Sequence, residues 1–261
     1  MKRVIFIIAM LSLATVTWAQ DTATPGEQVA LVWDAGEFNV HYLLFLPADY
    51  GADPDRRWPM IVFHHGSGQQ GSDANRVKVH GPPKIVEEEP DFPFIVLSPQ
   101  IPFFGDRPVS EINEAVTQLL LNVVEKQAVD ERRIYMTGLS GGGAYTWIIA
   151  YLMPPIFAAL APIASGYLDF IAADCGVPDV PIWAFNGMRD YAVPFEEGER
   201  MVNEIRACGA DIRFTAYEDA GHIETWERAY GDPELYDWFL SHQLPLPSAV
   251  TDQTWGQVKA R

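Results

Sequence analysis

The sequence IYMTGLSGGGAYTWIIAYL at residues 134–152 joins a short apolar run, a glycine-rich turn and an apolar segment of helical length. The short run is typical of a buried strand, and the longer segment from residue 144 favours a helix. The turn between them holds the pattern G-x-S-x-G, with Ser140 at its centre. In this context the pattern predicts a sharp turn that holds the serine hydroxyl above the carboxyl edge of a sheet. The alternative is a glycine-rich turn with an incidental serine.

The glycines that flank Ser140 suit such a turn. A residue at the tip of a tight strand-to-helix turn takes a strained backbone conformation, and glycine neighbours remove the side chains that would collide there. The helix that follows points its free N–H groups at the same place, where an oxyanion could be stabilised. The segment therefore predicts a serine nucleophile.

Short apolar runs alternate with helix-length segments along the rest of the chain. Strands are expected at residues 29–33, 40–46, 60–63, 94–97, 134–137, 157–163, 182–185 and 212–217, the first two as an antiparallel hairpin. Helical spacing covers residues 110–129, 142–152 and 195–207, and Ser110 is placed to cap the first of these segments. The alternation predicts an α/β fold with a mostly parallel central sheet, an N-terminal antiparallel hairpin and helices on both faces.

The composition is that of an ordered globular protein. Of the 261 residues 20% are charged and 12% aromatic, so the chain can bury enough apolar surface to offset its ordering entropy. The formal net charge of −17 argues against nucleic-acid binding, because such binding needs clustered lysine and arginine residues. An anionic membrane surface would also repel so acidic a protein. We expect one domain over residues 28–243.

Both ends of the chain are expected to lie outside that domain. Two basic residues precede an apolar run at residues 4–16, and residues 17–19 resemble a small-x-small cleavage site. The run is shorter than the roughly 20 residues that span a bilayer, so residues 1–19 are interpreted as a signal peptide, with an uncleaved anchor as the alternative. The protein is then exported to the periplasm or the medium, without stable membrane insertion. Residues 244–261 are expected to form a loosely held tail, or else a docked strand or helix.

Cys175 and Cys208 are the two cysteines of the chain. An even cysteine count in an exported protein predicts a disulfide between them, with two separate buried thiols as the alternative. If the strands that follow the two cysteines are parallel neighbours, both residues lie at the amino edge of the sheet, far from Ser140. Two cysteines alone cannot build a zinc site, and we expect neither a metal nor a cofactor.

Two later strands place an acid and a histidine where a serine nucleophile needs them. One expected strand leads into a turn that presents Asp190, and the last leads into a loop that presents His222. The chain order Ser, Asp, His is that of hydrolases with a G-x-S-x-G turn. His222 can take the Ser140 proton and return it to the leaving group, while the Asp190 carboxylate fixes the imidazole tautomer. Glu197 and Asp219 are the alternative acids.

A second loop is expected to complete the site. The sequence MIVFHHGSG at residues 60–68 is a strand that ends in His-Gly. In this kind of fold the loop after that strand supplies a backbone N–H to the oxyanion hole, beside the N–H of the residue after the nucleophile. The expected donors are the backbone N–H groups of Ser67 and Gly141. His65 is interpreted as a structural hydrogen-bonding residue of the loop, and no role is assigned to His64.

Five stretches of the sequence resemble a family of secreted α/β-hydrolases, related to bacterial esterases and polyester depolymerases, whose members are described as predicted peptidases, phospholipases or carboxylesterases. The stretches are HHGSGQQGSD from His64, HGPPKIVEEEPDFPFIVLSPQ from His80, DERRIYMTGLSGGGAYTW from Asp130, PIWAFNGMRDYAVP from Pro181 and RFTAYEDAGHIETWERAYGDPELYDWFLSHQ from Arg213. The resemblance implies the α/β-hydrolase fold and a triad at Ser140, Asp190 and His222.

Two positions depart from the pattern of that family. Gly141 stands where the family often has methionine. Residues 223–225 put one more residue between His222 and Trp226 than the common His-Asp-x-Trp spacing. We expect the extra residue to reshape the wall beside the leaving group.

The size of the substrate can be partly inferred. Only residues 165–180 lie where many lipases insert a large cap, too few for a cap domain, and an open site favours small acyl groups or esters attached to a polymer. Aromatic side chains of the expected rim loops could form a wall that favours acetyl or cinnamoyl-type esters, although each could simply pack its loop; they are Phe103, Phe104, Tyr167, Tyr191 and Trp226. The acidic chain disfavours polyanionic substrates.

The sequence therefore predicts a serine carboxylesterase that acts through an acyl-enzyme on small-molecule or polysaccharide-linked esters. One alternative is an oligopeptidase with the same triad, although such enzymes commonly add a large gating domain. The other alternative is a catalytically inactive hydrolase fold that binds a ligand or polysaccharide, and the intact Ser, Asp and His set argues against it.

Overall fold

A computed structural model describes residues 23–103, 105–153, 156–177 and 180–245 of the chain. The expected signal peptide, Phe104 and the expected tail beyond residue 245 lie outside the described residues. Among the described residues, none of the helices has the length and apolarity needed to cross a lipid bilayer.

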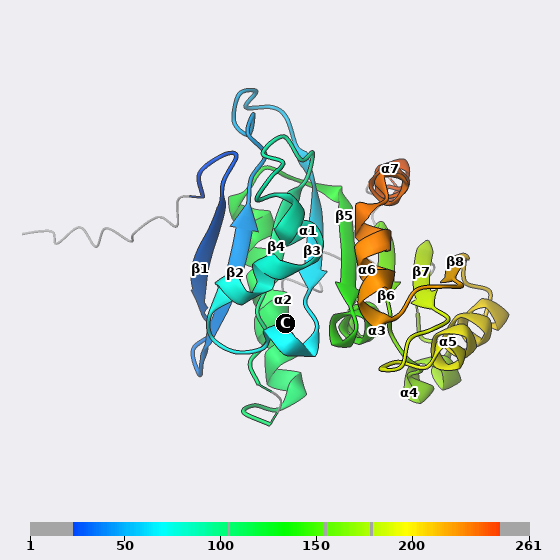
Figure 1. Cartoon of the computed structure of the whole chain (residues 1–261). Helices are drawn as coiled ribbons and strands as arrows, with labels where there is room; N and C mark the ends of the chain where they lie inside the picture. The colour runs from blue at the N-terminus through cyan, green and yellow to red at the C-terminus, as the bar shows by residue number, and fades with distance from the viewer. Residues whose placement is uncertain (1–22, 104, 154–155, 178–179, 246–261) are drawn as a thin grey trace, which may run out of the picture.

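The centre of the fold is one eight-stranded sheet with the strand order β1-β2-β4-β3-β5-β6-β7-β8 (Figure 1). The strands β1 and β2 form an antiparallel hairpin, β2 is antiparallel to β4, and all other neighbours are parallel. The predicted mostly parallel sheet with an N-terminal antiparallel hairpin is thus confirmed. The strands are β1 (Gln28–Asp34), β2 (Asn39–Phe45), β3 (Trp58–His64), β4 (Ile95–Pro99), β5 (Val129–Leu139), β6 (Ala159–Ile163), β7 (Ile182–Gly187) and β8 (Ile212–Tyr217).

Helices cover both faces of this sheet, as predicted. One face is covered by α2 (Val109–Lys126), α3 (Gly141–Leu152), α4 (Asp169–Asp174) and α5 (Phe195–Ala207). The other face is covered by the 3-10 helix η2 (Ala74–Val79) and by α1 (Gly81–Ile85), α6 (His222–Gly231) and α7 (Pro233–Ser241).

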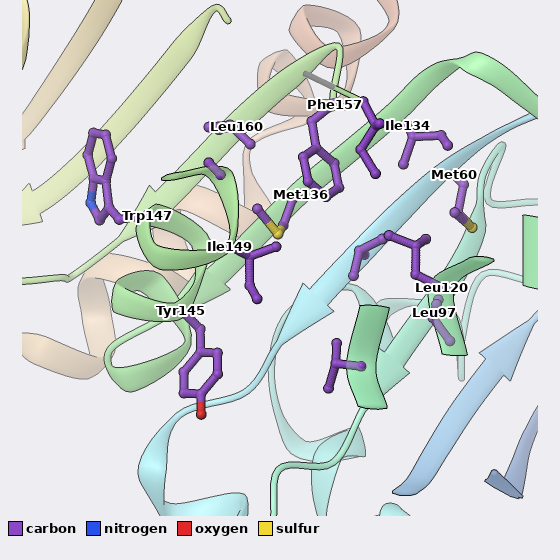
Figure 2. Close-up of a cluster of buried hydrophobic side chains, with 14 of the residues drawn as sticks. Met60, Leu97, Leu120, Ile134, Met136, Tyr145, Trp147, Ile149, Phe157 and Leu160 are labelled. Carbon is purple, nitrogen blue, oxygen red and sulfur yellow. The ribbon is translucent and has the colours of Figure 1, made fainter. Parts of the chain in front are cut away.

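The apolar runs of the strands are buried on both faces because successive side chains of a strand point to opposite sides. Met60 and Val62 of β3 belong to the core under α2 and α3, whereas Ile61 and Phe63 belong to the core under α6 and α7. Figure 2 shows the first of these cores, in which Met60 lies among side chains of several strands and helices. Two packed layers hold the sheet rigid and fix the positions of the loops at its edges.

The expected boundaries of one helix are wrong. Helix α2 begins at Val109 with Pro108 as its N-cap and no side-chain cap, so Ser110 lies inside the first turn and does not cap the helix. The fixed φ of proline prepares the helix start instead. The helix ends at Lys126 rather than at residue 129, because Val129 already pairs with Trp58 as the start of β5.

Hydrogen bonds extend the folded domain slightly beyond the expected residues 28–243 at both ends. The Gly26 N–H donates to the Leu46 carbonyl at 2.8 Å. At the other end the Leu244 N–H donates to the Arg132 carbonyl, and Arg132 Nε donates to the Leu244 carbonyl, each at 2.9 Å. Leu244 therefore belongs to the folded domain rather than to the expected tail.

Cys175 and Cys208 form the predicted disulfide, with their Cα atoms 5.5 Å apart. Each cysteine is the C-cap of a helix, α4 and α5 respectively. These helices precede β7 and β8, which are parallel neighbours, so the disulfide lies on the amino side of the sheet.

Candidate active site

Ser140 lies at the tip of the turn between β5 and α3. Its backbone has φ 55° and ψ −120°, a strained conformation for a residue with a side chain. The Ser140 N–H donates to the Ile163 carbonyl at 2.9 Å, and the Ser140 carbonyl accepts from the Ala144 N–H at 3.1 Å. The structure thus forms a sharp strand-to-helix turn at Ser140, whose side chain is partly exposed.

Glycines let the backbone close around this turn. A Cβ atom on Gly138 would collide with the carbonyl oxygen of Gly142, and a Cβ atom on Gly142 would collide with that of His64. The pattern G-x-S-x-G is therefore a packing requirement of this turn, because β3, β5 and α3 approach each other too closely for side chains.

The expected loop after β8 spans residues 218–221, and His222 follows it as the first residue of α6. The Thr225 N–H and hydroxyl both donate to the Gly221 carbonyl, at 3.1 and 2.7 Å, and close the first helical turn. The indole of Trp226, one turn further on, lies edge-on to the His222 ring with 4.8 Å between ring centroids. Helix geometry therefore fixes the imidazole, because residues four apart share one face of a helix.

Asp190 lies in the turn after β7, and its side chain is fully buried. One carboxylate oxygen lies 2.6 Å from His222 Nδ1. The other accepts the backbone N–H groups of Ala192 and Val193 at 2.9 and 2.8 Å. Both oxygens are therefore held, which orients the carboxylate toward the imidazole.

The three side chains form one continuous hydrogen-bonded arrangement, because His222 Nε2 lies 2.9 Å from Ser140 Oγ. A carboxylate only accepts hydrogen bonds, so Nδ1 of His222 carries the ring proton and Nε2 is free to accept from the Ser140 hydroxyl. The residues come from segments that follow β5, β7 and β8. These strands are parallel, so their carboxyl ends meet at the same edge of the sheet.

The two alternative acids, Asp219 and Glu197, lie in other surroundings. Asp219 accepts from Arg228 at 2.6 Å, and this hydrogen bond lowers the pKa of Asp219. Glu197 lies in the first turn of α5, beside Gly166. Among the described residues the carboxylate bonded to His222 is that of Asp190.

Ser67 and Gly141 lie next to each other. Ser67 is the first residue of the 3-10 helix η1 (Ser67–Gln69), and Gly141 is the first residue of α3. Backbone N–H groups in the first turn of a helix have no partner within that helix. Ser67 N lies 3.6 Å from the position of a Cβ on Gly141, and both residues line a cavity of about 10 Å³. That volume is about what one water-sized atom needs.

The expected structural role of His65 is borne out by its contacts. Its Nδ1 donates to the Gly66 carbonyl at 2.7 Å, and its Nε2 accepts the Ile101 N–H at 2.8 Å. Burial lowers the pKa of His65 to about 4, so the ring stays neutral and ties the loop after β3 to the end of β4. His64 is fully buried against the Tyr145 ring, and burial lowers its pKa to about 3.

Four of the five aromatic residues expected to line the substrate, all but Phe104, lie in the described part of the chain. No ring contact joins any two of the four that the structure describes. Phe103 is half exposed and Tyr191 almost wholly exposed, whereas the Tyr167 hydroxyl donates to Glu204 at 2.6 Å. Trp226 is buried beneath His222, because residues four apart lie on one face of α6.

The sheet order, the strained turn at Ser140 and the positions of the three side chains are those of the α/β-hydrolase fold, and the chain is an α/β-hydrolase in structure. Residues 102–228 match the model of the Dienelactone hydrolase family.

Known proteins similar to this chain are named as hydrolases. A solved structure described as a thermostable esterase superposes with a TM-score of 0.68 at 28% identity, covering 84% of this chain and 64% of the esterase. A protein of Salmonella typhimurium named as a carboxymethylenebutenolidase is 31% identical over 103 residues, which are 36% of this chain and 37% of that protein. A protein of Oryza sativa subsp. japonica named as a carboxylesterase is 24% identical over 191 residues, 62% of this chain and 80% of that protein. The match thus spans little more than a third of the Salmonella relative.

Proposed function

We propose that this protein is a serine carboxylesterase that hydrolyses carboxylic esters through an acyl-enzyme. The observation that carries the proposal is the hydrogen-bonded arrangement from Ser140 Oγ through His222 to the buried Asp190. The similarity to proteins named as esterases and carboxylesterases supports the same chemistry.

In the proposed reaction Ser140 Oγ attacks the ester carbonyl carbon while its proton passes to His222 Nε2. The carbonyl oxygen becomes an oxyanion, which the N–H groups of Ser67 and Gly141 stabilise. The carbon–oxygen bond to the alcohol then breaks, and His222 gives its proton to the departing oxygen. A water molecule, deprotonated by His222, releases the carboxylic acid from Ser140. Asp190 holds the imidazole and stabilises its protonated form.

The proposed substrates are short-chain esters or acyl groups, of acetyl or cinnamoyl type, attached to a polymer. Support comes from the small amount of chain beside the site, since α4 is the one described helix between β6 and β7. An open site does not enclose a long acyl chain.

We also propose that the protein is exported and that residues 1–19 are its signal peptide. The disulfide between Cys175 and Cys208 supports this assignment, because disulfides persist mainly in oxidising compartments.

Hydrolysis of p-nitrophenyl acetate by the wild type and by Ser140→Ala tests the function. We expect the variant to lose about 10⁴-fold or more in kcat while keeping its melting temperature, because the nucleophile is gone. Mass spectrometry of the quenched wild-type reaction should find the acetyl group on Ser140. Equal rates for the two proteins would refute the mechanism, and hydrolysis of peptides in preference to esters would favour an oligopeptidase.

A further inference from the structure

Two further polar side chains line the cavity of about 10 Å³ beside Ser67 and Gly141, those of Gln70 and Tyr145. Each of these two residues is only 6% exposed. The Tyr145 hydroxyl and the Gln70 amide nitrogen are buried, and neither has a hydrogen-bond partner among the described residues. A buried polar group without a partner costs free energy, so each of these groups calls for a partner that enters the cavity. We call this cavity the Ser67–Gly141 cavity.

Helix geometry directs the Tyr145 side chain toward this cavity. Tyr145 lies four residues after Gly141 in α3, so the two residues share one face of the helix. Side chains of a helix lean toward its amino end, which places the Tyr145 ring over the turn that begins with Gly141. Figure 2 shows the Tyr145 hydroxyl pointing away from the other labelled side chains, toward the loop that follows β3. The His64 ring packs against the Tyr145 ring, with 5.7 Å between centroids, and supports this direction.

The polar groups that this cavity offers to an occupant are mainly hydrogen-bond donors. Gln70 Nε2 can only donate. Burial raises the pKa of Tyr145 above its usual value, so the hydroxyl keeps its proton at neutral pH. The ring nitrogens of His65, which also lines the cavity, are both engaged, with the Gly66 carbonyl and the Ile101 N–H. Together with the proposed donor N–H groups of Ser67 and Gly141, these side chains favour an oxygen that carries negative charge.

The volume of the cavity matches one oxygen atom and no larger group. In the proposed reaction the carbonyl oxygen of the ester is the substrate atom that enters the oxyanion hole and gains negative charge there. A hydrogen bond to an ionised oxygen is roughly twice as strong as a hydrogen bond to a neutral one. A donor in this cavity therefore stabilises the transition state more than the bound ester, which raises kcat.

We propose that Tyr145 and Gln70 are further oxyanion donors, whose hydroxyl and amide groups donate to the carbonyl oxygen of the substrate as it gains charge. This inference rests on the proposed esterase function. It adds two side chains to the backbone N–H groups of Ser67 and Gly141.

The test uses a trifluoromethyl ketone, which forms a stable tetrahedral adduct with a serine nucleophile. Ser140 Oγ bonds to the ketone carbon, the carbonyl electron pair moves to the oxygen, and the Ser140 proton passes to His222. The variant Tyr145→Phe removes the hydroxyl and keeps the ring, and Gln70→Met removes the amide from a side chain of similar length. The matched control is Tyr151→Phe, which removes a hydroxyl from the same helix, where it donates to Asp174 at 2.6 Å.

We expect Tyr145→Phe and Gln70→Met each to lower kcat for p-nitrophenyl acetate about tenfold, with KM changed less than twofold. Binding of the ketone should weaken by the same factor. In ¹³C NMR spectra of the adduct with carbonyl-labelled ketone, the pH at which the adduct oxygen takes up its proton should rise by about one pH unit, because a donor to the oxyanion is lost. The Tyr151→Phe control should match the wild type in all three measurements.

Wild-type kinetics in either variant would overturn the assignment of that residue. A fall in kcat without a change in the protonation of the adduct oxygen would also overturn it, because a buried water molecule or a purely structural contact would produce that result. Failure of the esterase function is distinguishable. The wild type would then form no adduct with the ketone and would hydrolyse p-nitrophenyl acetate no faster than Ser140→Ala.

Discussion

The hydroxyl oxygen of Ser67 lies 2.8 Å from the point that a Cβ atom on Gly141 would occupy. Residue 141 therefore has no room for a side chain while Ser67 keeps its present rotamer. The serine and the glycine of this chain therefore fit each other as a pair.

This contact predicts that Gly141→Ala lowers kcat, by up to about tenfold, because the new methyl group pushes the Ser67 hydroxyl out of its place beside the two proposed backbone oxyanion donors. The double variant Gly141→Ala/Ser67→Gly should recover most of the loss, since the colliding hydroxyl is removed. Steady-state kinetics on p-nitrophenyl acetate measures both. A single variant as active as the wild type, or a double variant no better than the single, would contradict the pairing.

Asp190→Asn should lower kcat by about 10³- to 10⁴-fold with little change in KM. An amide can present its N–H to His222 Nδ1 and so stabilise the wrong tautomer, which leaves Nε2 unable to accept the Ser140 proton. The matched controls are Asp219→Asn and Glu197→Gln, which should stay within about twofold of the wild type. If either control lost as much as Asp190→Asn, the acid would be assigned wrongly.

The buried histidines predict a loss of stability in acid. Burial lowers the pKa of His64 to about 3 and that of His65 to about 4, whereas both side chains titrate near 6.5 in the unfolded chain. Between pH 6.5 and about 4 the unfolded state therefore binds protons that the folded state does not. We expect the free energy of unfolding to fall as the pH drops through this window, by up to about 1.4 kcal/mol per pH unit for each histidine.

Urea titrations between pH 7 and pH 4 measure this slope. A His64→Met variant should show a shallower slope than the wild type, because one of the two groups is removed. The comparison is made on slopes, so a constant change in stability from repacking does not affect it. An identical slope would show that His64 takes up its proton without unfolding.

Reduction of the Cys175–Cys208 disulfide should lower the melting temperature by roughly 6–16 °C. The bond closes a loop with a sequence separation of 33 residues, for which the chain-entropy estimate is roughly 3–4 kcal/mol. The rate per folded molecule should not change, because the bond lies on the amino side of the sheet and Ser140 follows a carboxyl end. Cys175→Ser/Cys208→Ser is the control and should not respond to reductant. A melting temperature unaffected by reduction would refute the stabilising role.

The strands buried on both faces could be predicted from the sequence because near-continuous apolar runs have no other stable place than the centre of a layered fold. The strand at residues 129–133 could not be predicted, because this part of β5 is rich in charged residues and extends beyond most of the neighbouring strands. Short helices such as α1 and α4 were missed for a related reason, since five or six residues carry too little periodicity.

The positions of Ser140, Asp190 and His222 followed from chain order and strand ends, which parallel topology brings to one edge. The side chains that pack against these three residues could not be predicted in the same way. Trp226 was expected to face the substrate, yet it is buried under His222, because the helical start of α6 could not be recognised from the loop-like sequence before it. Contacts between distant segments, such as Ser67 with Gly141, depend on the exact approach of two loops and have no local signal.

The docking of Leu244 on Arg132 has a practical consequence. Arg132 lies near the amino end of β5 and Ser140 just past its carboxyl end, so eight residues of extended chain, about 26 Å, separate the two. A solid support or fusion partner joined to the chain after Leu244 would therefore be attached on the amino side of the sheet, opposite the edge that carries Ser140. In a protein immobilised in this way, the proposed active site at Ser140 would face the solution, where even a bulky insoluble substrate could reach Ser140.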